Sequence, residues 1–307
     1  QDNTAQRLPE LAASVEMGAP EMFVTEIGWS RDAFEARGVP VDALRRSLEI
    51  LALTLEESLP ESAFAAVEPC LNRGIEACVA SEKKERRIPA DGTLGVLMLE
   101  YLEQAMRGDR VAAVTTIVQA FEKGTPVEDL YERVLLASEA EIGTMWHLGE
   151  VSISEEHMVT ETARAVMGVL CYLSTGKKIP PEDRPTVTVA AVEGDRHDLG
   201  VRAVSDLFEI AGFRSVCLGA SSPASDIAQA VEDYGARYVV LSAAMSVHVP
   251  SVTTTIRAIR ERTPNARILV GGEAFRSSDQ LPEIVGADGF ASSPREAVRL
   301  AKEWESA

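Results

Sequence analysis

The stretch that decides the fold is TVTVAAVEGDRHDLG, at residues 186–200. Its first seven residues, Thr186–Val192, are apolar or β-branched, which is typical of a buried strand. A polar loop from Asp195 to Gly200 follows, and an amphipathic stretch of helical length then runs over Gly200–Ala211. A strand, a polar loop and a helix in this order predict one unit of a parallel sheet with helices on its faces.

The same alternation continues along the rest of the chain. The other strand-like runs are Ser215–Leu218, Tyr238–Leu241 and Ile268–Val270, and the helical stretches are Pro223–Tyr234 and Val249–Thr263. We therefore predict that residues 184–307 form a doubly wound, flavodoxin-like α/β domain with a parallel sheet. Ligands of such domains bind beyond the carboxyl ends of the strands, near the point where the strand order reverses. The loops after the first, third and fourth strands are therefore the candidate binding loops.

The residues before this domain are predicted to be helical. Residues 89–180 contain four helical stretches joined by short connections, which predicts an antiparallel four-helix bundle: Leu94–Met106, Arg110–Glu122, Val127–Trp146 and Ser154–Leu173. Ser154 is the expected N-cap of the last helix. Residues 1–88 form a predicted helical domain, with helical spacing at Val41–Leu55 and Ser62–Val79. The expected linkers are a charged segment, 81–91, and a proline-rich segment, 174–185.

The composition is acidic. The 307 residues include 48 Asp and Glu against 30 Lys and Arg, which gives a formal net charge of −18. This charge disfavours nucleic acid and anionic membrane as partners. Residues 1–88 carry 16 acidic and 10 basic side chains, so they lack the basic face of a helix-turn-helix reader and we expect no direct DNA binding. We also expect no membrane span, because no apolar run reaches the roughly 18 residues that one requires.

The cysteine pattern argues against a disulfide framework. Cys70, Cys78, Cys171 and Cys217 show no C-x-x-C spacing. We expect each to be a small buried hydrophobic residue, and we expect the protein in a reducing cytoplasm.

The three candidate loops carry polar and glycine residues at a defined spacing. Along the chain they read D-x-H-x-x-G, then after 41 residues S-x-A, then after 26 residues G-G. The residues concerned are Asp195, His197, Gly200, Ser242, Gly271 and Gly272. Each feature alone is ordinary, but together they resemble the cobalamin-binding signature of methionine synthases, corrinoid proteins and cobalamin-dependent mutases. The one departure is Ala244, where that signature has leucine.

The resemblance implies a role for each of these residues. His197 is the expected lower axial ligand of the cobalt, in place of the cofactor's own dimethylbenzimidazole, because neutral imidazole suits an axial position. Asp195 is expected to accept the other ring N–H and so to fix the tautomer. The displaced nucleotide tail then lies in the sheet domain, with its free nitrogen in reach of the Ser242 hydroxyl. The three glycines of the signature leave room where the tail passes the backbone.

The predicted bundle carries a second motif, where its third helix meets its fourth. Trp146 and His147 precede Glu156 and His157 in a W-x9-E-H pattern. This pattern resembles that of CarH-type adenosylcobalamin photoreceptors, in which the bundle lies over the upper face of the corrin. The resemblance implies that Trp146 and Glu156 hold the adenosyl group of adenosylcobalamin. It also implies that His147 becomes the upper cobalt ligand after light breaks the cobalt–carbon bond.

We therefore predict a cobalamin-binding light sensor rather than an enzyme, and a homo-oligomer, either dimer or tetramer, whose bundle rearranges after photolysis. Residues 1–88 lie outside the resemblance, and CarH-type repressors carry a basic DNA reader there. A related group, the photocobilins, couples the same unit to a bilin, so biliverdin is a second candidate cofactor with no assigned pocket.

The main alternative is a corrinoid methyl carrier of a methyltransferase system. Such a carrier shares the His197 loop and the bundle but has no need for the W-x9-E-H motif. Cobalamin-dependent mutases are disfavoured, because their chemistry needs a barrel of about 250 residues. A cofactor-free interaction module is a third reading, which the intact axial loop disfavours. His248 follows the Ser242 loop; we interpret it as an ordinary loop histidine, the alternative being that it approaches the buried nucleotide tail.

Overall fold

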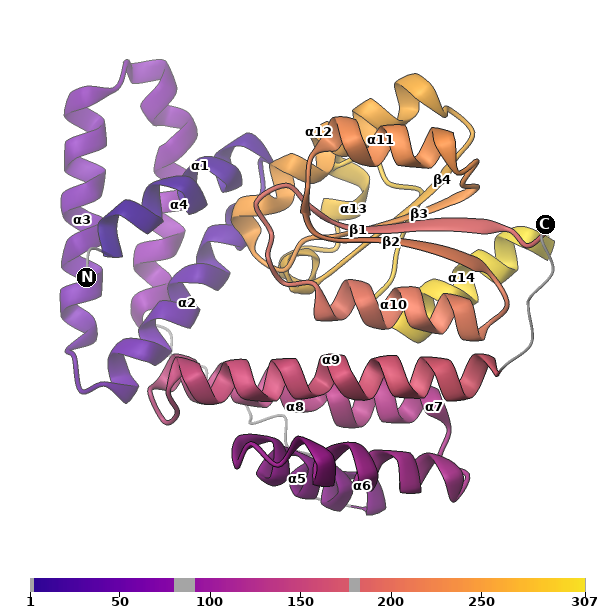
Figure 1. Cartoon of the computed structure of the whole chain (residues 1–307). Coiled ribbons are helices and arrows are strands. Elements are labelled where there is room, and N and C mark those ends of the chain that lie inside the picture. Colours follow the sequence, from indigo (N-terminus) through magenta and orange to yellow (C-terminus); the bar gives the residue numbers. More distant parts are fainter. Residues whose placement is uncertain (1–2, 80–91, 177–182, 307) are drawn as a thin grey trace.

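The computed structural model describes residues 3–79, 92–176 and 183–306 (Figure 1). The predicted linker at 81–91 and residues 177–182 of the second one lie outside the described residues. The chain forms three groups of elements: the N-terminal helices α1–α4, a helical bundle made of α5–α9, and a sheet domain that begins with β1. The bundle lies below the sheet domain in Figure 1, and the N-terminal helices lie beside both.

The sheet confirms the prediction of a doubly wound α/β fold. Its five parallel strands have the flavodoxin-like order β2-β1-β3-β4-β5. Their bounds are Thr186–Val192, Arg214–Ser222, Tyr238–Ser242, Arg267–Gly271 and Gly289–Phe290 for β1 to β5. Ala191 pairs with Ser242, and Ser242 pairs with Gly271. The carboxyl ends of β1, β3 and β4 are therefore level, and the loops that follow them meet at one edge.

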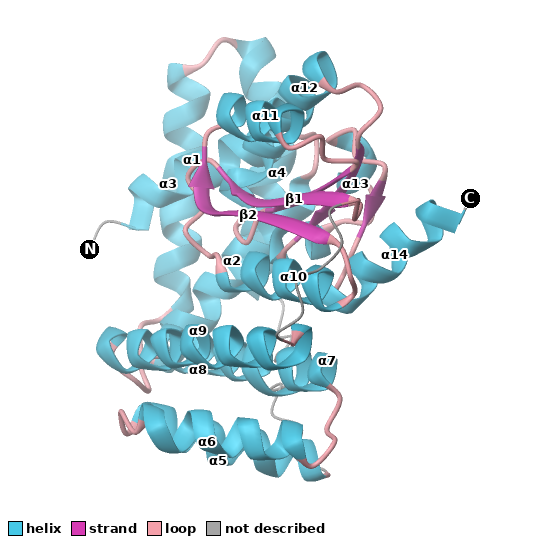
Figure 2. Cartoon of the chain, turned by 45° about the vertical axis from the view of Figure 1, so that its right-hand side comes forward, coloured by secondary structure: helices cyan, strands magenta, loops and turns pink. Residues whose placement is uncertain are grey.

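Helices cover both faces of the sheet (Figure 2). Helices α10 (Leu199–Ile210) and α14 (Pro294–Ser306) pack together below it in Figure 1, and α11 (Ala224–Asp233) and α12 (Val249–Arg262) pack together above it. Three short helices complete the domain: η2 (Ser246–His248), η3 (Glu273–Ser277) and α13 (Leu281–Ile284). Every residue of β1 is buried, and successive residues alternate between the two cores.

The bundle has the four helical stretches that the sequence predicts. They are α5 (Thr93–Met106), α6 (Arg110–Glu122), the continuous run α7 (Val127–Asp129), η1 (Leu130–Leu135) and α8 (Leu136–Leu148), and α9 (Ile153–Thr175). Within the third stretch η1 is a π-helical segment, which the hydrophobic spacing does not reveal. The predicted N-cap at Ser154 is wrong. Ser152 caps α9 instead, because its hydroxyl accepts a hydrogen bond from the Glu155 amide while the Glu155 carboxylate accepts one from the Ser152 amide.

The N-terminal helices are α1 (Asn3–Glu16), α2 (Pro20–Ala36), α3 (Val41–Ser58) and α4 (Glu61–Val79). The last two match the predicted helical spacing, whereas the sequence did not reveal α1 and α2 individually. Phe23 and Ile27 of α2 are fully buried in the core of these four helices. On the same helix Met22 belongs to the core of the sheet domain, as do Ala13 of α1 and Met17, which directly follows α1. The N-terminal helices are therefore packed firmly onto the sheet domain, where α1 contacts η2 and α2 contacts η3.

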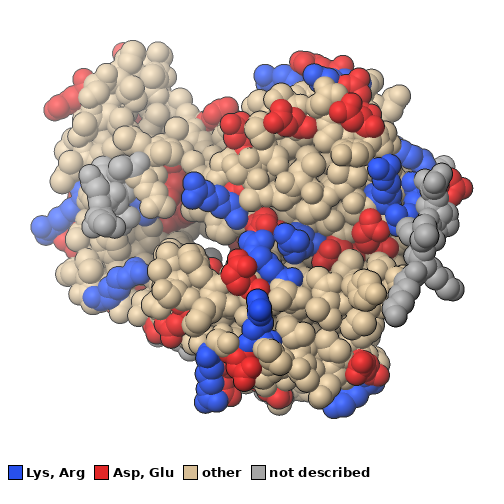
Figure 3. Space-filling model, viewed as in Figure 1, with Lys and Arg blue, Asp and Glu red and all other residues tan. Residues whose placement is uncertain are grey.

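The bundle is packed onto the other face of the sheet domain through α9 and α10. Polar contacts cross this junction, and Figure 3 shows basic and acidic side chains gathered there. Arg164 of α9 donates to Asp198 just before α10 at 2.7 Å. The buried Tyr131 hydroxyl lies 2.9 Å from the Asp206 carboxylate of α10. Arg295 of α14 donates to Asp129 of α7 at 2.7 Å.

The cysteine prediction is correct in part. Cys70 and Cys78 are buried and Cys171 is half-buried, but Cys217 is exposed. Cys217 lies on β2, which is an edge strand and is much less buried than β1. Across the described ranges, no helix combines the length and the apolar character needed to cross a membrane.

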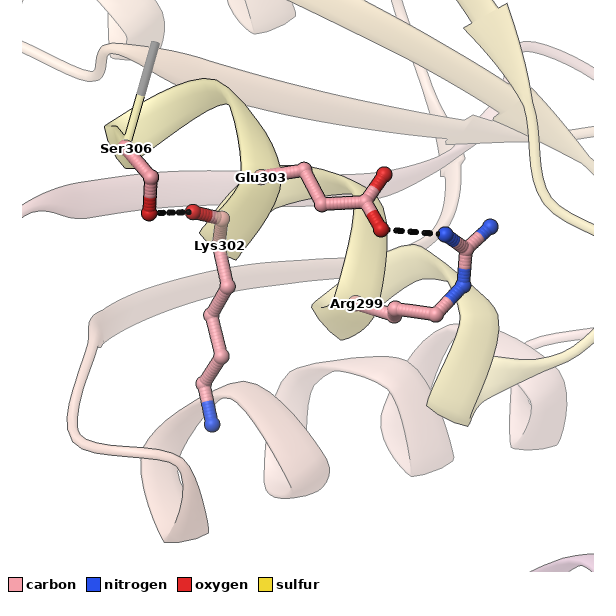
Figure 4. Close-up of a pocket in the computed structure, with 4 residues that line it drawn as sticks. All are labelled: Arg299, Lys302, Glu303 and Ser306. Carbon is pink, nitrogen blue, oxygen red and sulfur yellow. Dashed lines mark hydrogen bonds and ion pairs between the residues drawn. The ribbon is translucent and has the colours of Figure 1, made fainter.

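A shallow hollow on α14 lies away from the level carboxyl ends of the strands (Figure 4). It is lined by Arg299, Lys302, Glu303 and Ser306. The next residues of the same helix, Trp304 and Glu305, contact Arg267 and Tyr238, which begin β4 and β3. The hollow therefore lies toward the amino edge of the sheet, and the ligand site predicted from the loops is elsewhere.

The buried Tyr131 hydroxyl gives a test of the junction between bundle and sheet domain. Tyr131→Phe leaves the half-buried Asp206 carboxylate without that donor, so we expect a loss of about 1–3 kcal/mol in the free energy of unfolding. Tyr172→Phe on the same bundle removes an exposed hydroxyl and should change it by less than about 0.5 kcal/mol. Urea unfolding of both variants measures the difference, and equal stabilities would contradict the assignment.

A half-buried carboxylate in the bundle, that of Glu139, makes stability depend on pH. Glu139 of α8 accepts a hydrogen bond from the Thr160 hydroxyl of α9 at 2.8 Å, and burial raises the pKa of Glu139 from 4.5 to about 7. The folded state therefore holds a proton that unfolding releases, and stability is lost as pH rises between these two values.

Glu139→Gln keeps a hydrogen-bond acceptor for Thr160 and removes the titration. As pH rises from about 5 to about 8, we expect the free energy of unfolding of Glu139→Gln minus that of the parent to increase by up to about 3 kcal/mol, because only the parent loses stability. Glu122→Gln, at an exposed position of α6, should track the parent at every pH. Denaturant unfolding across this range measures the gain, and a constant difference between Glu139→Gln and the parent would refute the pKa shift.

Candidate functional site

The centre of the site is the fully buried carboxylate of Asp195, in the loop after β1. Its Oδ1 accepts hydrogen bonds from the backbone amide and the ring Nδ1 of His197, at 3.0 and 2.8 Å. Its Oδ2 accepts one from the Ala244 amide after β3, at 2.6 Å. Burial alone would raise the pKa of Asp195, but these hydrogen bonds outweigh it and hold the pKa below its ordinary value. The carboxylate is therefore an anion that joins the loops after β1 and β3.

His197 is oriented by this carboxylate. Because Nδ1 donates to Asp195, the other ring nitrogen, Nε2, points away from the carboxylate, and 61% of the side chain is exposed. The Asp195 hydrogen bond also raises the pKa of His197, which makes the imidazole a stronger base. An exposed imidazole with its tautomer fixed by a buried carboxylate has the form of a metal ligand with its outer partner in place.

The other signature residues surround this loop. Ser242 is half-buried at the end of β3, and Gly271 and Gly272 follow at the end of β4. Gly272 has a φ of +101°, and a Cβ there would lie 2.2 Å from the Ala243 carbonyl oxygen. Gly272 is thus required by the close approach of two backbone segments, in addition to any role toward a ligand. At Gly200, in the first turn of α10, a Cβ would meet no atom of the described residues within 4 Å.

His248 belongs to the same cluster, although the sequence favours an ordinary loop histidine. Its Nδ1 lies 3.9 Å from the Asp195 carboxylate, and its ring would lie only 3.1 Å from a Cβ at Gly194. Burial lowers the pKa of His248, and Nδ1 is buried with no hydrogen-bond partner among the described residues. The only available signal in the sequence was its position after the third strand.

The bundle places Glu156 opposite the axial loop. Glu156 and His157 lie in the first turn of α9, where His157 Nδ1 donates to the Glu156 carboxylate. The other oxygen of Glu156 lies 3.3 Å from the Thr160 hydroxyl. Glu156 is close enough to His197 for its negative charge to help raise the pKa of that histidine. Of the W-x9-E-H motif, Glu156 is therefore a residue whose charge reaches His197.

Trp146 and His147, at the end of α8, have different surroundings. The Trp146 side chain is 44% exposed. The His147 ring stacks on Trp29 of α2, with 3.9 Å between ring centroids and 27° between planes. His147 Nε2 donates to the Trp29 carbonyl at 2.7 Å. In this arrangement that nitrogen is not available to a metal, and its predicted role as an upper ligand stays a prediction.

The residues present fit a cobalamin whose lower ligand is supplied by the protein. The donor is a single exposed imidazole with a fixed tautomer, which suits a metal whose equatorial positions are filled by a corrin. Beside it, within the part of the chain that the structure describes, the buried His248 Nδ1 has no hydrogen-bond partner and a Cβ at Gly200 would meet no atom within 4 Å. A nucleotide tail at this edge of the sheet would therefore find a hydrogen-bonding group in His248 and room beside Gly200.

Comparison with known proteins supports this assignment. Residues 185–299 match the family described as B12 binding domain, and residues 99–170 match a second family with the same description. The first match covers the sheet domain and the second lies within the bundle. The N-terminal helices lie outside both.

The relatives are corrinoid proteins. A corrinoid protein of Desulfitobacterium hafniense is 25% identical over 208 residues, which are 66% of this chain and 95% of that protein. The dimethylamine corrinoid protein 1 of Methanosarcina acetivorans is 25% identical over 213 residues, or 67% of this chain and 96% of that protein. The structure of the Methanosarcina barkeri monomethylamine corrinoid protein has the same fold, with a TM-score of 0.60, 20% identity, and coverage of 69% of this chain and 100% of that one. The two matched domains and these relatives support cobalamin binding by this chain.

Proposed function

We propose that the chain is a corrinoid carrier protein that binds cobalamin between the bundle and the sheet domain. The observation that carries the proposal is the exposed His197 imidazole, held by the buried Asp195 carboxylate and opposed by Glu156 of the bundle. The relatives support the carrier over the light sensor that the W-x9-E-H motif favours, because they are corrinoid proteins and one is named for dimethylamine.

Each part of the chain has a task in this proposal. Bound cobalamin supplies a cobalt ion that accepts and releases a methyl group at its upper face. His197 would hold the cobalt through Nε2, with its ring oriented by Asp195. Ser242 at the end of β3 and the glycine pair at the end of β4 would border the nucleotide tail. Glu156 and its neighbours on α9 would shield the cobalt from water. Partner proteins that deliver or remove the methyl group reach this face when the bundle moves aside.

The proposal keeps the division into residues 1–88, 89–180 and 184–307, with the bundle as the cap over the corrin. The Arg164 contact with Asp198, one residue after His197, joins that cap directly to the axial loop. A reducing cytoplasm suits the free cysteines.

His197→Ala tests the lower ligand. The parent protein mixed with hydroxocobalamin should give the spectrum of a base-off form with histidine bound. In His197→Ala we expect a base-on or five-coordinate spectrum, and a loss of affinity of about 10–100-fold or more, the range seen when support of a metal ligand is removed. Arg196→Ala, at an exposed neighbour, should keep the parent's spectrum and affinity. An unchanged spectrum in His197→Ala would refute the assignment.

A light sensor is the second candidate, and one observation favours it. The charge of Glu156, a residue of the W-x9-E-H motif, reaches His197, as that of a residue near an upper-face adenosyl group would. In this version the cofactor is adenosylcobalamin, His147 leaves Trp29 to become the upper ligand after photolysis, and a homo-oligomer changes its state. Biliverdin would be a further cofactor of this version.

Green light on the adenosylcobalamin-loaded protein separates the two candidates. The carrier should give the same photoproduct spectrum and elution volume in the parent and in His147→Ala. The sensor should give a stable new spectrum and a changed elution volume in the parent, both lost in His147→Ala while dark binding remains. Absorption spectra and size-exclusion chromatography before and after illumination record the outcome. A new red band after incubation with biliverdin would add the bilin to the sensor.

A further inference from the structure

Helix α2 contacts both parts of the proposed site, although it lies outside the two matched domains. The Glu26 carboxylate accepts a hydrogen bond from the Ser246 hydroxyl of η2 at 2.8 Å. Three residues later, Trp29 stacks on His147 and its carbonyl accepts the His147 Nε2–H. Residues three apart lie on one face of a helix, so a single turn of α2 joins the sheet domain to the bundle.

The end of this connection at Glu26 is rigid. Met22 is fully buried in the core of the sheet domain, which fixes α2 against it. Ser246 is also buried, and η2 ends at His248, which packs against Gly194 and lies near Asp195. Glu26 therefore supports, from behind, the loop that borders the axial residues.

The other end holds the part of the bundle nearest to the axial loop. His147 is the second-last residue of α8, and a short turn then leads to α9 and Glu156. The contacts at Tyr131 and Arg295 join the bundle to the sheet domain at η1 and α7, before α8 begins. The Trp29 contact with His147 therefore adds a further attachment at the far end of α8, beyond these contacts and the Arg164–Asp198 pair.

We propose that α2 is a tether, which holds the α8–α9 end of the bundle against the sheet domain and so controls access to the upper face of the corrin. The inference rests on the proposed function, because it places the corrin between these two parts. While the tether is closed, His147 Nε2 donates to Trp29 and is withheld from cobalt. Opening the upper face to a partner then requires the Trp29–His147 contact to break.

Hydrogen exchange of the cobalamin-free protein tests the tether independently of the proposed function. In Trp29→Ala we expect amides of residues 141–153 to exchange about tenfold faster, as the loss of one aromatic pair implies, with α5 and α6 unchanged. Thr25→Ala, at an exposed position of α2, should match the parent. His147→Phe keeps the stacking and removes the hydrogen bond, so it should show a smaller rise and serves if Trp29→Ala does not fold. Parent-like exchange in both site variants would overturn the proposal.

Cobalamin release tests the control of access. Protein loaded with hydroxocobalamin is mixed with excess cyanocobalamin, and we expect Trp29→Ala to release its ligand about tenfold faster than the parent and Thr25→Ala. The spectrum of the bound form should stay that of the parent, since His197 is untouched. A parent that binds no cobalamin refutes the proposed function, whereas normal binding with equal release rates refutes the tether.

Discussion

The rest of the site depends on one buried anion, the Asp195 carboxylate. An ionised carboxylate without partners is costly inside a protein, and here three donors offset that cost. Two of them come from His197 and the third from the backbone at Ala244, so the same charge orients the imidazole and ties the loop after β1 to the loop after β3. Replacing any of these donors would leave a buried charge under-solvated. The geometry around His197 is therefore maintained by the folding free energy of the sheet domain.

The sequence predicted the sheet domain well because its determinants are local and periodic. The β-branched runs, the helical stretches between them and the D-x-H-x-x-G loop lie within short windows, and parallel pairing then brings the ends of β1, β3 and β4 level. The prediction that Asp195 holds His197 follows from a separation of two residues. The bundle was predictable for the same reason, apart from the π-helical segment and the capping serine, which depend on local backbone geometry.

The features that the sequence did not predict depend on contacts between residues far apart in the chain. Trp29 and His147 are separated by 118 positions, and Glu26 and Ser246 by 220. Nothing in the spacing of α2 distinguishes these residues from other polar or aromatic positions on a helix. The position of His248 against Asp195 is also a product of tertiary packing. For this reason the W-x9-E-H motif favoured His147 as a cobalt ligand after illumination. In the structure, the His147 imidazole instead stacks on Trp29 of α2 and donates to its carbonyl.

The contacts between bundle and sheet domain differ in strength along the bundle, and this difference favours opening at one end. At η1 the Tyr131 side chain is fully buried, so its contact with Asp206 is expensive to break. The ion pair of Arg164 with Asp198 is partly exposed, and such pairs contribute little on average. Without α2, the α8–α9 end would therefore be the weaker one, and it is the end that carries Glu156. An aromatic contact anchored in the sheet domain adds stability at that end, and it can break while the η1 end stays packed.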